Sequence, residues 1–232
     1  MIEITKIKTY GWEEAIRGMR NSYNSWDKSD SEFDMSGSGL PVIGPNDLAL
    51  MKKLCAAGTD HCKFRRMIMV SMDINAPVYW WKEYDTYKVG TVANSCSTMH
   101  KIAEKELTLD DFSCEHLLQS SSTQLELYSA LVCAPTNDGK PQWTPMMHLL
   151  STVAGLNHYR EKYLETKDKK YWWQIIQLLP SSYNQRRTVM LNYEVLANIY
   201  KSRKNHKLDE WQTFCKIMES TLPYPELFTT RK

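Results

Sequence analysis

The sequence predicts one α+β domain, and three features support this fold class. The opening segment alternates apolar and polar residues (IEITKIKTY), as a half-buried strand does. Residues 64–74 form a nearly continuous apolar run after two arginines (FRRMIMVSMDI), which favours a strand covered on both faces. A short buried helix is the alternative for that run. From Thr144 onward the pattern is mostly helical, so strands dominate early and helices late.

The first half of the chain contains several helix boundaries. Residues 11–21 predict a first helix, with apolar side chains at helical spacing, and residues 22–44 predict a long loop rich in Ser, Asp, Gly and Pro. Pro45 begins a helix that runs to about residue 57. Pro77 suits the first position of the next helix, because its missing N–H belongs to the unpaired first turn. Thr108 to Asp111 resembles a helix cap.

The second half of the chain predicts four helices, at residues 145–167, 169–179, 187–204 and 207–220. Pro180 ends the second of them and Pro223 closes the last. We find no internal repeat and no convincing linker, so residues 1–232 are expected to form one domain. The segment 115–143, with a turn at 137–141, is a candidate insertion.

Composition excludes several classes of function. A 27.1 kDa chain with 42% hydrophobic residues can bury a real core, and a net charge of +2 argues against nucleic acid as the main partner. No apolar run approaches the length of a spanning helix and the start lacks a signal-peptide core, so a cytoplasmic location without membrane is expected. The six cysteines form no CxxC pair, and no metal site is predicted.

The predicted helix 187–204 carries the most informative geometry. Asn192, Leu196, Ile199 and Arg203 follow steps of four, three and four, so they share one face, with about 16 Å between its ends. One interpretation is a core helix with polar ends in water. The other is a wall along an extended ligand, with an amide at one end and a guanidinium at the other. Arginine suits a pyrimidine carbonyl or a phosphate because its fork donates two hydrogen bonds. His206, just beyond, is either a loop residue or part of that wall.

Two further segments allow a structural or a functional interpretation. Ser95, Cys96 and Ser97 can offer hydroxyls and N–H groups to a phosphate, or can simply cap a helix. Catalysis through Cys96 would need a base, for which His100 is the nearby candidate. The aromatic run at 79–81 could stack on a flavin, or fill a core or interface. Sequence motifs of Rossmann and P-loop sites are absent.

Taken in order along the chain, these segments resemble the flavin-dependent thymidylate synthases (ThyX). The hinge Ala76-Pro77 and the chain to Lys101 follow that family's strand, hinge, aromatic helix and polar segment. Residues 192–211 follow its later Asn, Asn, Arg, His and Trp pattern, and Arg20 and Ser22 match an early Ala-Ala-Arg-x-Ser run. The chain departs from the family in four places. Thr86-Tyr87-Lys88 stands for the family's basic triplet, Cys96 for its Ser and Thr98 for its next Arg. The arginine that the family has shortly before the Leu-Pro pair is absent from residues 174–177.

The resemblance implies a central mixed or antiparallel sheet flanked by helices, a helical C-terminal half and a homotetramer with shared active sites. It implies transfer of one carbon from methylenetetrahydrofolate to C5 of dUMP or a related pyrimidine nucleotide, with FAD reduced by NADPH. Arg203 matches the catalytic, pyrimidine-holding arginine. The remaining implied roles are flavin binding by Asn192, Asn198, His206 and Lys88, and substrate binding by Ser95, Cys96, Ser97 and Arg203. The altered triplet leaves an alternative open: a non-catalytic scaffold or nucleotide-binding assembly protein without flavin chemistry.

Overall fold

The computed structural model describes residues 1–33, 41–118 and 144–230. The predicted turn at 137–141 and most of the candidate insertion 115–143 lie outside these residues. The chain divides into two compact units, and each is described by itself. The smaller unit contains Met1, Ala76–Tyr79 and Cys96–Gln185, and the larger contains Ile2–Asn75, Trp80–Ser95 and Arg186–Lys232. That residues 1–232 form one domain stays a prediction.

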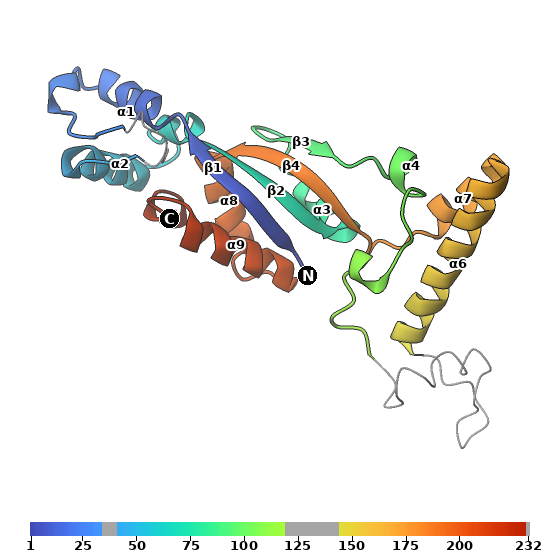
Figure 1. Ribbon diagram of the computed structural model, residues 1–232. Coiled ribbons are helices and arrows are strands. Elements are labelled where there is room, and N and C mark those ends of the chain that lie inside the picture. The colour runs from blue at the N-terminus through green and yellow to red at the C-terminus, as the bar shows by residue number, and fades with distance from the viewer. Residues whose placement is uncertain (34–40, 119–143, 231–232) are drawn as a thin grey trace. The chain divides into compact units, whose positions relative to one another are not determined.

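A four-stranded sheet, almost all of it in the larger unit, confirms the predicted α+β class (Figure 1). The strands lie in the order β1-β2-β4-β3, and their bounds are β1 Glu3–Tyr10, β2 Met69–Pro77, β3 Val92–Ser95 and β4 Asn184–Asn192. β1 is antiparallel to β2, and β3 is antiparallel to β4, with Ser95 opposite Arg187. Hydrogen bonds from Tyr193 to Ile68 and from Val78 to Tyr183, at opposite ends of β2 and β4, make the central pair antiparallel too.

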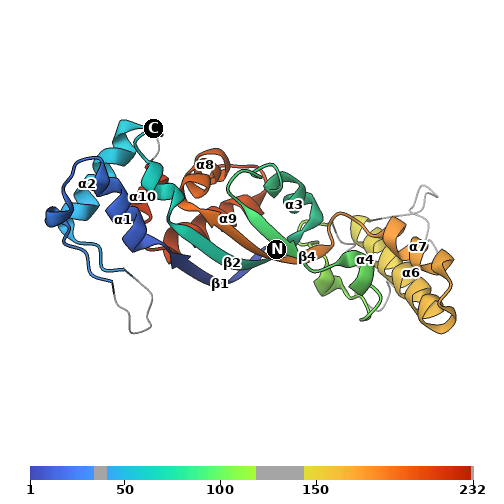
Figure 2. The same ribbon diagram turned by 90° about the horizontal axis from the view of Figure 1, so that it is seen from above.

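Helices cover one face of this sheet, because the strands bury alternate side chains. The larger unit holds α1 Trp12–Asn21, α2 Pro45–Ala57, most of α3 Val78–Tyr84, α8 Tyr193–Arg203, α9 Asp209–Thr221 and α10 Glu226–Thr229. Its short 3-10 turns are η1 Trp26–Lys28 and η2 Lys63–Arg66. Figure 2 shows α3 and α8 on the same side of the strands. The buried residues Val70, Met72 and Ile74 of β2 alternate with partly exposed ones, so one face of β2 meets the core.

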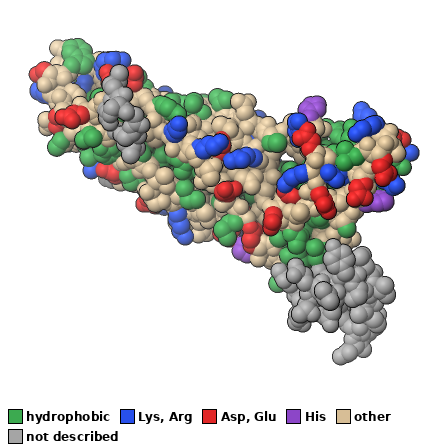
Figure 3. Space-filling model, viewed as in Figure 1, with side chains coloured by type: hydrophobic (Ala, Val, Ile, Leu, Met, Phe, Trp, Pro, Cys, Tyr) green, Lys and Arg blue, Asp and Glu red, His purple; other side chains and the backbone are tan. Residues whose placement is uncertain are grey.

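The opposite face of the sheet is polar. Asp73 accepts a hydrogen bond from Thr188 at 2.6 Å and pairs with Lys6 at 3.2 Å. Arg186 lies 3.7 Å from the same carboxylate. Hydrogen bonds from Thr188 and Lys6 lower the pKa of Asp73. On the face that Figure 3 shows, Lys and Arg side chains lie among Asp and Glu side chains. This agrees with the small net charge of the chain.

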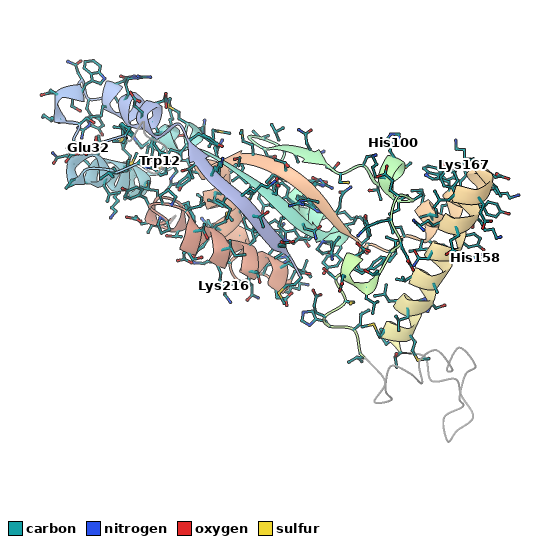
Figure 4. The ribbon with its side chains drawn as sticks, in the orientation of Figure 1. Trp12, Glu32, His100, His158, Lys167 and Lys216 are labelled. Atoms are coloured by element: carbon teal, nitrogen blue, oxygen red, sulfur yellow. The ribbon has the colours of Figure 1, made fainter. Side chains whose placement is uncertain are left out.

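Aromatic side chains build the core under the sheet. The Trp80 ring lies 4.5 Å from that of Trp211, stacks on Tyr84 at 5.3 Å and lies 5.9 Å from Phe214. All four side chains are buried. A second group surrounds Trp12 (Figure 4), whose ring is 5.2 Å from that of Tyr193. Of the two interpretations of the aromatic run at 79–81, the structure therefore places Trp80 and Trp81 in the core.

A buried ion pair holds the start of the loop after α1. Asp47, on α2, accepts hydrogen bonds from Arg20 at 2.7 Å, from Ser29 at 2.8 Å and from Ser31 at 2.6 Å. The Asp30 N–H adds another at 3.1 Å. Burial by itself would raise the pKa of Asp47, but these hydrogen bonds outweigh it and lower the pKa. The network therefore fixes the described beginning of the predicted 22–44 loop.

The smaller unit is mainly helical. It contains α4 Thr98–Lys101, η3 Leu109–Asp111, α6 Pro145–Thr166 and α7 Lys169–Leu178. The pair α6 and α7 encloses a core of Leu149, Val153, Leu156 and Ile175, with Ile102, Leu107 and Phe112 packed into it. His158 and Lys167 lie on and just after α6 (Figure 4). Reciprocal bonds between Thr108 and Asp111 form the predicted cap.

The predicted helix 187–204 is wrong in its first third. Residues up to Asn192 belong to β4, and α8 begins at Tyr193. In β4, buried Val189 and Leu191 alternate with exposed Thr188 and Met190. This alternation has the period of a strand, and β4 lies beside β2 in the sheet. The predicted strand at 64–74 also begins later, at Met69, because residues 63–66 form η2, and Pro77 ends β2 instead of starting α3.

Candidate functional site

Arg203 and Glu83 form the centre of a polar cluster in the larger unit. Arg203 is the last residue of α8, and Glu83 lies on α3. The Arg203 Nη1 donates to Glu83 Oε2 at 2.5 Å. The two residues are 120 positions apart in the sequence. Their ion pair joins the two stretches that resemble the ThyX family, residues 76–101 and 192–211. Their side chains are 17% and 34% exposed, so the pair is partly shielded from solvent.

Aromatic residues hold this pair in place. Trp211 donates from its Nε1 to Glu83 Oε2 at 3.0 Å, and the Arg203 guanidinium lies 4.9 Å from the Trp211 ring centre. Tyr87 accepts a hydrogen bond from Arg203 Nε at 2.9 Å. Stacking and charge-assisted hydrogen bonds therefore fix the guanidinium plane before any ligand arrives.

His206 completes the cluster. Its Nδ1 accepts a hydrogen bond from the Leu208 N–H at 3.2 Å, and its backbone oxygen accepts one from Gln212 at 2.8 Å. The other ring nitrogen, Nε2, lies 2.9 Å from Arg203 Nη1 and 3.6 Å from Glu83 Oε2. A neutral imidazole has one acceptor nitrogen and a guanidinium only donates, so the ring accepts either from Leu208 or from Arg203. His206 is thus a fixed neighbour of the Arg203–Glu83 pair.

The predicted face of α8 is retained from residue 192 onward. Asn192 is the N-cap, and its side chain accepts hydrogen bonds from the N–H groups of Glu194 and Val195. Leu196 and Ile199 are buried, and Arg203 ends the face. The polar end at Asn192 therefore stabilises the helix start. Asn198 is exposed on the same helix.

The loop that replaces the basic triplet lies between α3 and β3. Tyr87 faces Arg203, whereas Lys88 is exposed. Gly90 has φ +81°, and a Cβ there would lie 3.0 Å from Val195 and 3.2 Å from the Asn192 amide. Any larger residue would be strained and would press on the start of α8. Glycine thus lets this loop pack against α8.

The predicted substrate segment 95–97 divides between the two units. Ser95, in the larger unit, is exposed at the end of β3. Ser97, in the smaller unit, caps α4 by accepting from the His100 N–H at 3.3 Å. The Cys96 backbone oxygen accepts from Gln185 at 3.1 Å, and the Cys96 side chain is exposed. The structure thus brings Arg203 together with His206 in the larger unit, whereas Cys96 and Ser97 belong to the smaller unit.

A second arginine in the larger unit is held in the same manner. Arg187, on β4, donates to Asp85 at 2.8 Å and lies 4.3 Å from the ring centre of Trp81. Burial raises the pKa of the neighbouring Tyr84, with Asp85 adding to the effect. The α3 helix and the turn after it thus present two acids, and each binds an arginine of a later element.

Sequence reasoning missed Glu83 as a site residue, and it treated Tyr87 only as a departure from a basic triplet. The usable signal was composition: two acids, Glu83 and Asp85, occur just before the positions of the family's basic triplet. Acids at those positions could have predicted arginine partners, but only the tertiary structure identifies which ones.

The described residues give little support for metal binding or for thiol chemistry. Those residues contain no group of three His, Cys, Asp or Glu side chains that could hold a metal ion. Burial raises the pKa of Cys55 and of Cys215 to about 12, so both thiols stay protonated. No helix in the described ranges combines the length and apolar character needed to cross a membrane.

Solved structures match this chain over nearly its whole length. Thymidylate synthase X from Helicobacter pylori, determined with FAD and dUMP, superimposes with a TM-score of 0.65 at 17% identity, covering 99% of this chain and 97% of that one. The chain has the ThyX fold. A second structure of the Helicobacter pylori flavin-dependent thymidylate synthase ThyX, complexed with FAD and dUMP, gives a TM-score of 0.62 at 17% identity over 97% and 98% of the two chains. No protein-family model and no curated protein sequence matches this chain.

Proposed function

We propose that this protein is a divergent ThyX-like enzyme that transfers one carbon to C5 of a pyrimidine nucleotide, dUMP or a related one. The observation that supports the proposal most is the Arg203 cluster within a ThyX fold. The two sequence stretches that resemble the family meet there, through Arg203, Glu83 and Tyr87. The fold alone would host other chemistry as readily, so the fixed guanidinium carries the functional argument.

Arg203 has the properties that such a reaction needs. Its guanidinium is oriented in advance by Tyr87 and Trp211, which lowers the reorganisation required when charge develops on a bound ring. A pyrimidine carbonyl that accepts from Arg203 would be polarised as C5 becomes nucleophilic. Ser95, Cys96 and Ser97 are proposed to hold the nucleotide phosphate through hydroxyls and N–H groups. We further propose assembly as a homotetramer with sites shared between subunits.

The residues assigned to a flavin fit it in part. Asn198 and Lys88 are exposed and can supply an amide and an ammonium to its ring or phosphates. Asn192 is occupied as the cap of α8, and the His206 ring already faces Leu208 and Glu83. When bound, FAD would supply the redox chemistry, with NADPH as the reductant and methylenetetrahydrofolate as the carbon donor. The protein's own residues would bind, orient and exclude water.

Flavin uptake tests the enzymatic proposal. Full-length protein mixed with FAD and passed through a desalting column should retain absorbance near about 450 nm. The Lys88→Ala variant should retain less FAD, because it removes the exposed cation of the loop between α3 and β3. A colourless wild-type protein would contradict the flavin assignment.

A second candidate is a non-catalytic ThyX-like scaffold that binds nucleotides or assembles without flavin. The ion pair between Arg203 and Glu83 favours it, because the arginine is already neutralised within its own unit. Wild-type protein that binds a pyrimidine nucleotide and takes up no FAD would support this scaffold.

A further inference from the structure

Glu83 has an acceptor atom that the cluster does not use. The hydrogen bonds from Arg203 and Trp211 both fall on Oε2, and His206 approaches the same oxygen. Among the described residues, no hydrogen bond reaches the other oxygen, Oε1. The Glu83 side chain is 34% exposed, so part of it faces solvent. A carboxylate oxygen is therefore presented beside a fixed guanidinium.

This arrangement offers a ligand one acceptor next to one donor. An ionised carboxylate only accepts hydrogen bonds, and a guanidinium only donates them. Cytosine carries an exocyclic amino group, which donates, beside ring N3 and O2, which accept. Uracil carries O4, which only accepts, at the position of that amino group, and a donating N3–H at the position of the accepting N3 of cytosine. Acidic side chains accordingly accept from the cytosine amino group in known base recognition.

We propose that Glu83 is a specificity-determining residue and that the site takes a 4-aminopyrimidine, a cytosine nucleotide, in preference to a uracil nucleotide. The inference rests on the proposed function, since it places the pyrimidine against Arg203. Oε1 accepts the amino group, while Arg203 donates to the neighbouring ring acceptors. A uracil ring in the same pose sets O4 against Oε1, two acceptors without a proton between them.

The substitution Glu83→Gln has a predictable orientation. Arg203 and Trp211 both donate to the position of Oε2, so the amide oxygen must occupy that position. The amide NH2 group is then forced to the position of Oε1. There it donates to uracil O4 and opposes the cytosine amino group. One substitution of nearly equal size should therefore reverse the base preference.

Calorimetric titration of the full-length protein, with FAD present, tests the inference with dCMP and dUMP as probes. We expect wild-type protein to bind dCMP more tightly than dUMP by about tenfold or more. In Glu83→Gln the ratio should fall to about one or reverse. Because the wild-type ratio is measured separately, a variant that fails to fold does not remove the test.

Asp85→Asn is the matched control. It removes one negative charge two residues away, from the other acid–arginine pair, and should leave the dCMP to dUMP ratio within about threefold of wild type. An equal change in Asp85→Asn would overturn the role of Glu83. Wild-type protein that binds dUMP as tightly as dCMP, or more tightly, would overturn the inference and keep the proposed function. Binding of neither nucleotide would overturn both.

Discussion

Asp47→Ala should lower the free energy of unfolding by about 3–5 kcal/mol, the usual result of removing one partner from a buried ion pair. Asp47 is fully buried, and Arg20, at 4% exposure, would lose its charged partner. Ser29, Ser31 and the Asp30 N–H would lose their acceptor as well. Urea unfolding followed by circular dichroism measures the change.

The same pair gives stability a pH dependence. The pKa of Asp47 is lowered in the folded state, so its contribution is present above the unfolded value of about 3.9 and is lost as pH falls below it. The difference between wild type and Asp47→Ala should therefore narrow below about pH 4. The control Glu165→Ala removes an exposed acid of α6 and should cost less than about 0.5 kcal/mol. Equal effects of the two substitutions would contradict this account of the Asp47 network.

Arg203→Ala should weaken binding of a pyrimidine nucleotide by about 100-fold or more, because charged hydrogen bonds contribute about 1.5–3 kcal/mol each. The expected cost in stability is small, about 1 kcal/mol, since Arg203 and Glu83 are both partly solvated. Titration calorimetry and thermal melting of the same sample separate the two effects.

Arg186→Ala is the control for Arg203. Arg186 belongs to the same larger unit, but its side chain is 59% exposed and lies beside Asp73 on the polar face of the sheet. Its loss should leave nucleotide affinity within about threefold of wild type. A large drop in melting temperature for Arg203→Ala, with unchanged affinity, would assign Arg203 a structural role.

The sequence predicted most elements whose periodicity is long and local. The strand at 3–10 and the helices beginning at Trp12, Pro45, Pro145 and Lys169 have clear capping or alternating patterns, and the structure contains them. The prediction is wrong for residues 187–192, which it includes in a helix and which form the end of β4. Their strand conformation is decided by pairing with β2 and β3, which a local pattern does not contain.

The site was predictable only in its outline. The resemblance identified Arg203 and His206, and the structure brings these two together. Their contact with Glu83, Tyr87 and Trp211 depends on how α3 and α9 pack, so no spacing in the sequence reveals it. The sequence allowed Asn192 to bind a ligand or to end a core helix, and it gave no reason to choose between them. In the structure, the Asn192 side chain caps the start of α8.

Release of tritium from C5-labelled pyrimidine nucleotides tests the central claim most directly. Full-length protein would be incubated with FAD, NADPH, methylenetetrahydrofolate and C5-tritiated dCMP or dUMP. The account predicts release of tritium to water from at least one nucleotide, and loss of that release in Arg203→Ala. Flavin-loaded protein that binds a nucleotide but releases no tritium from either one would contradict the account.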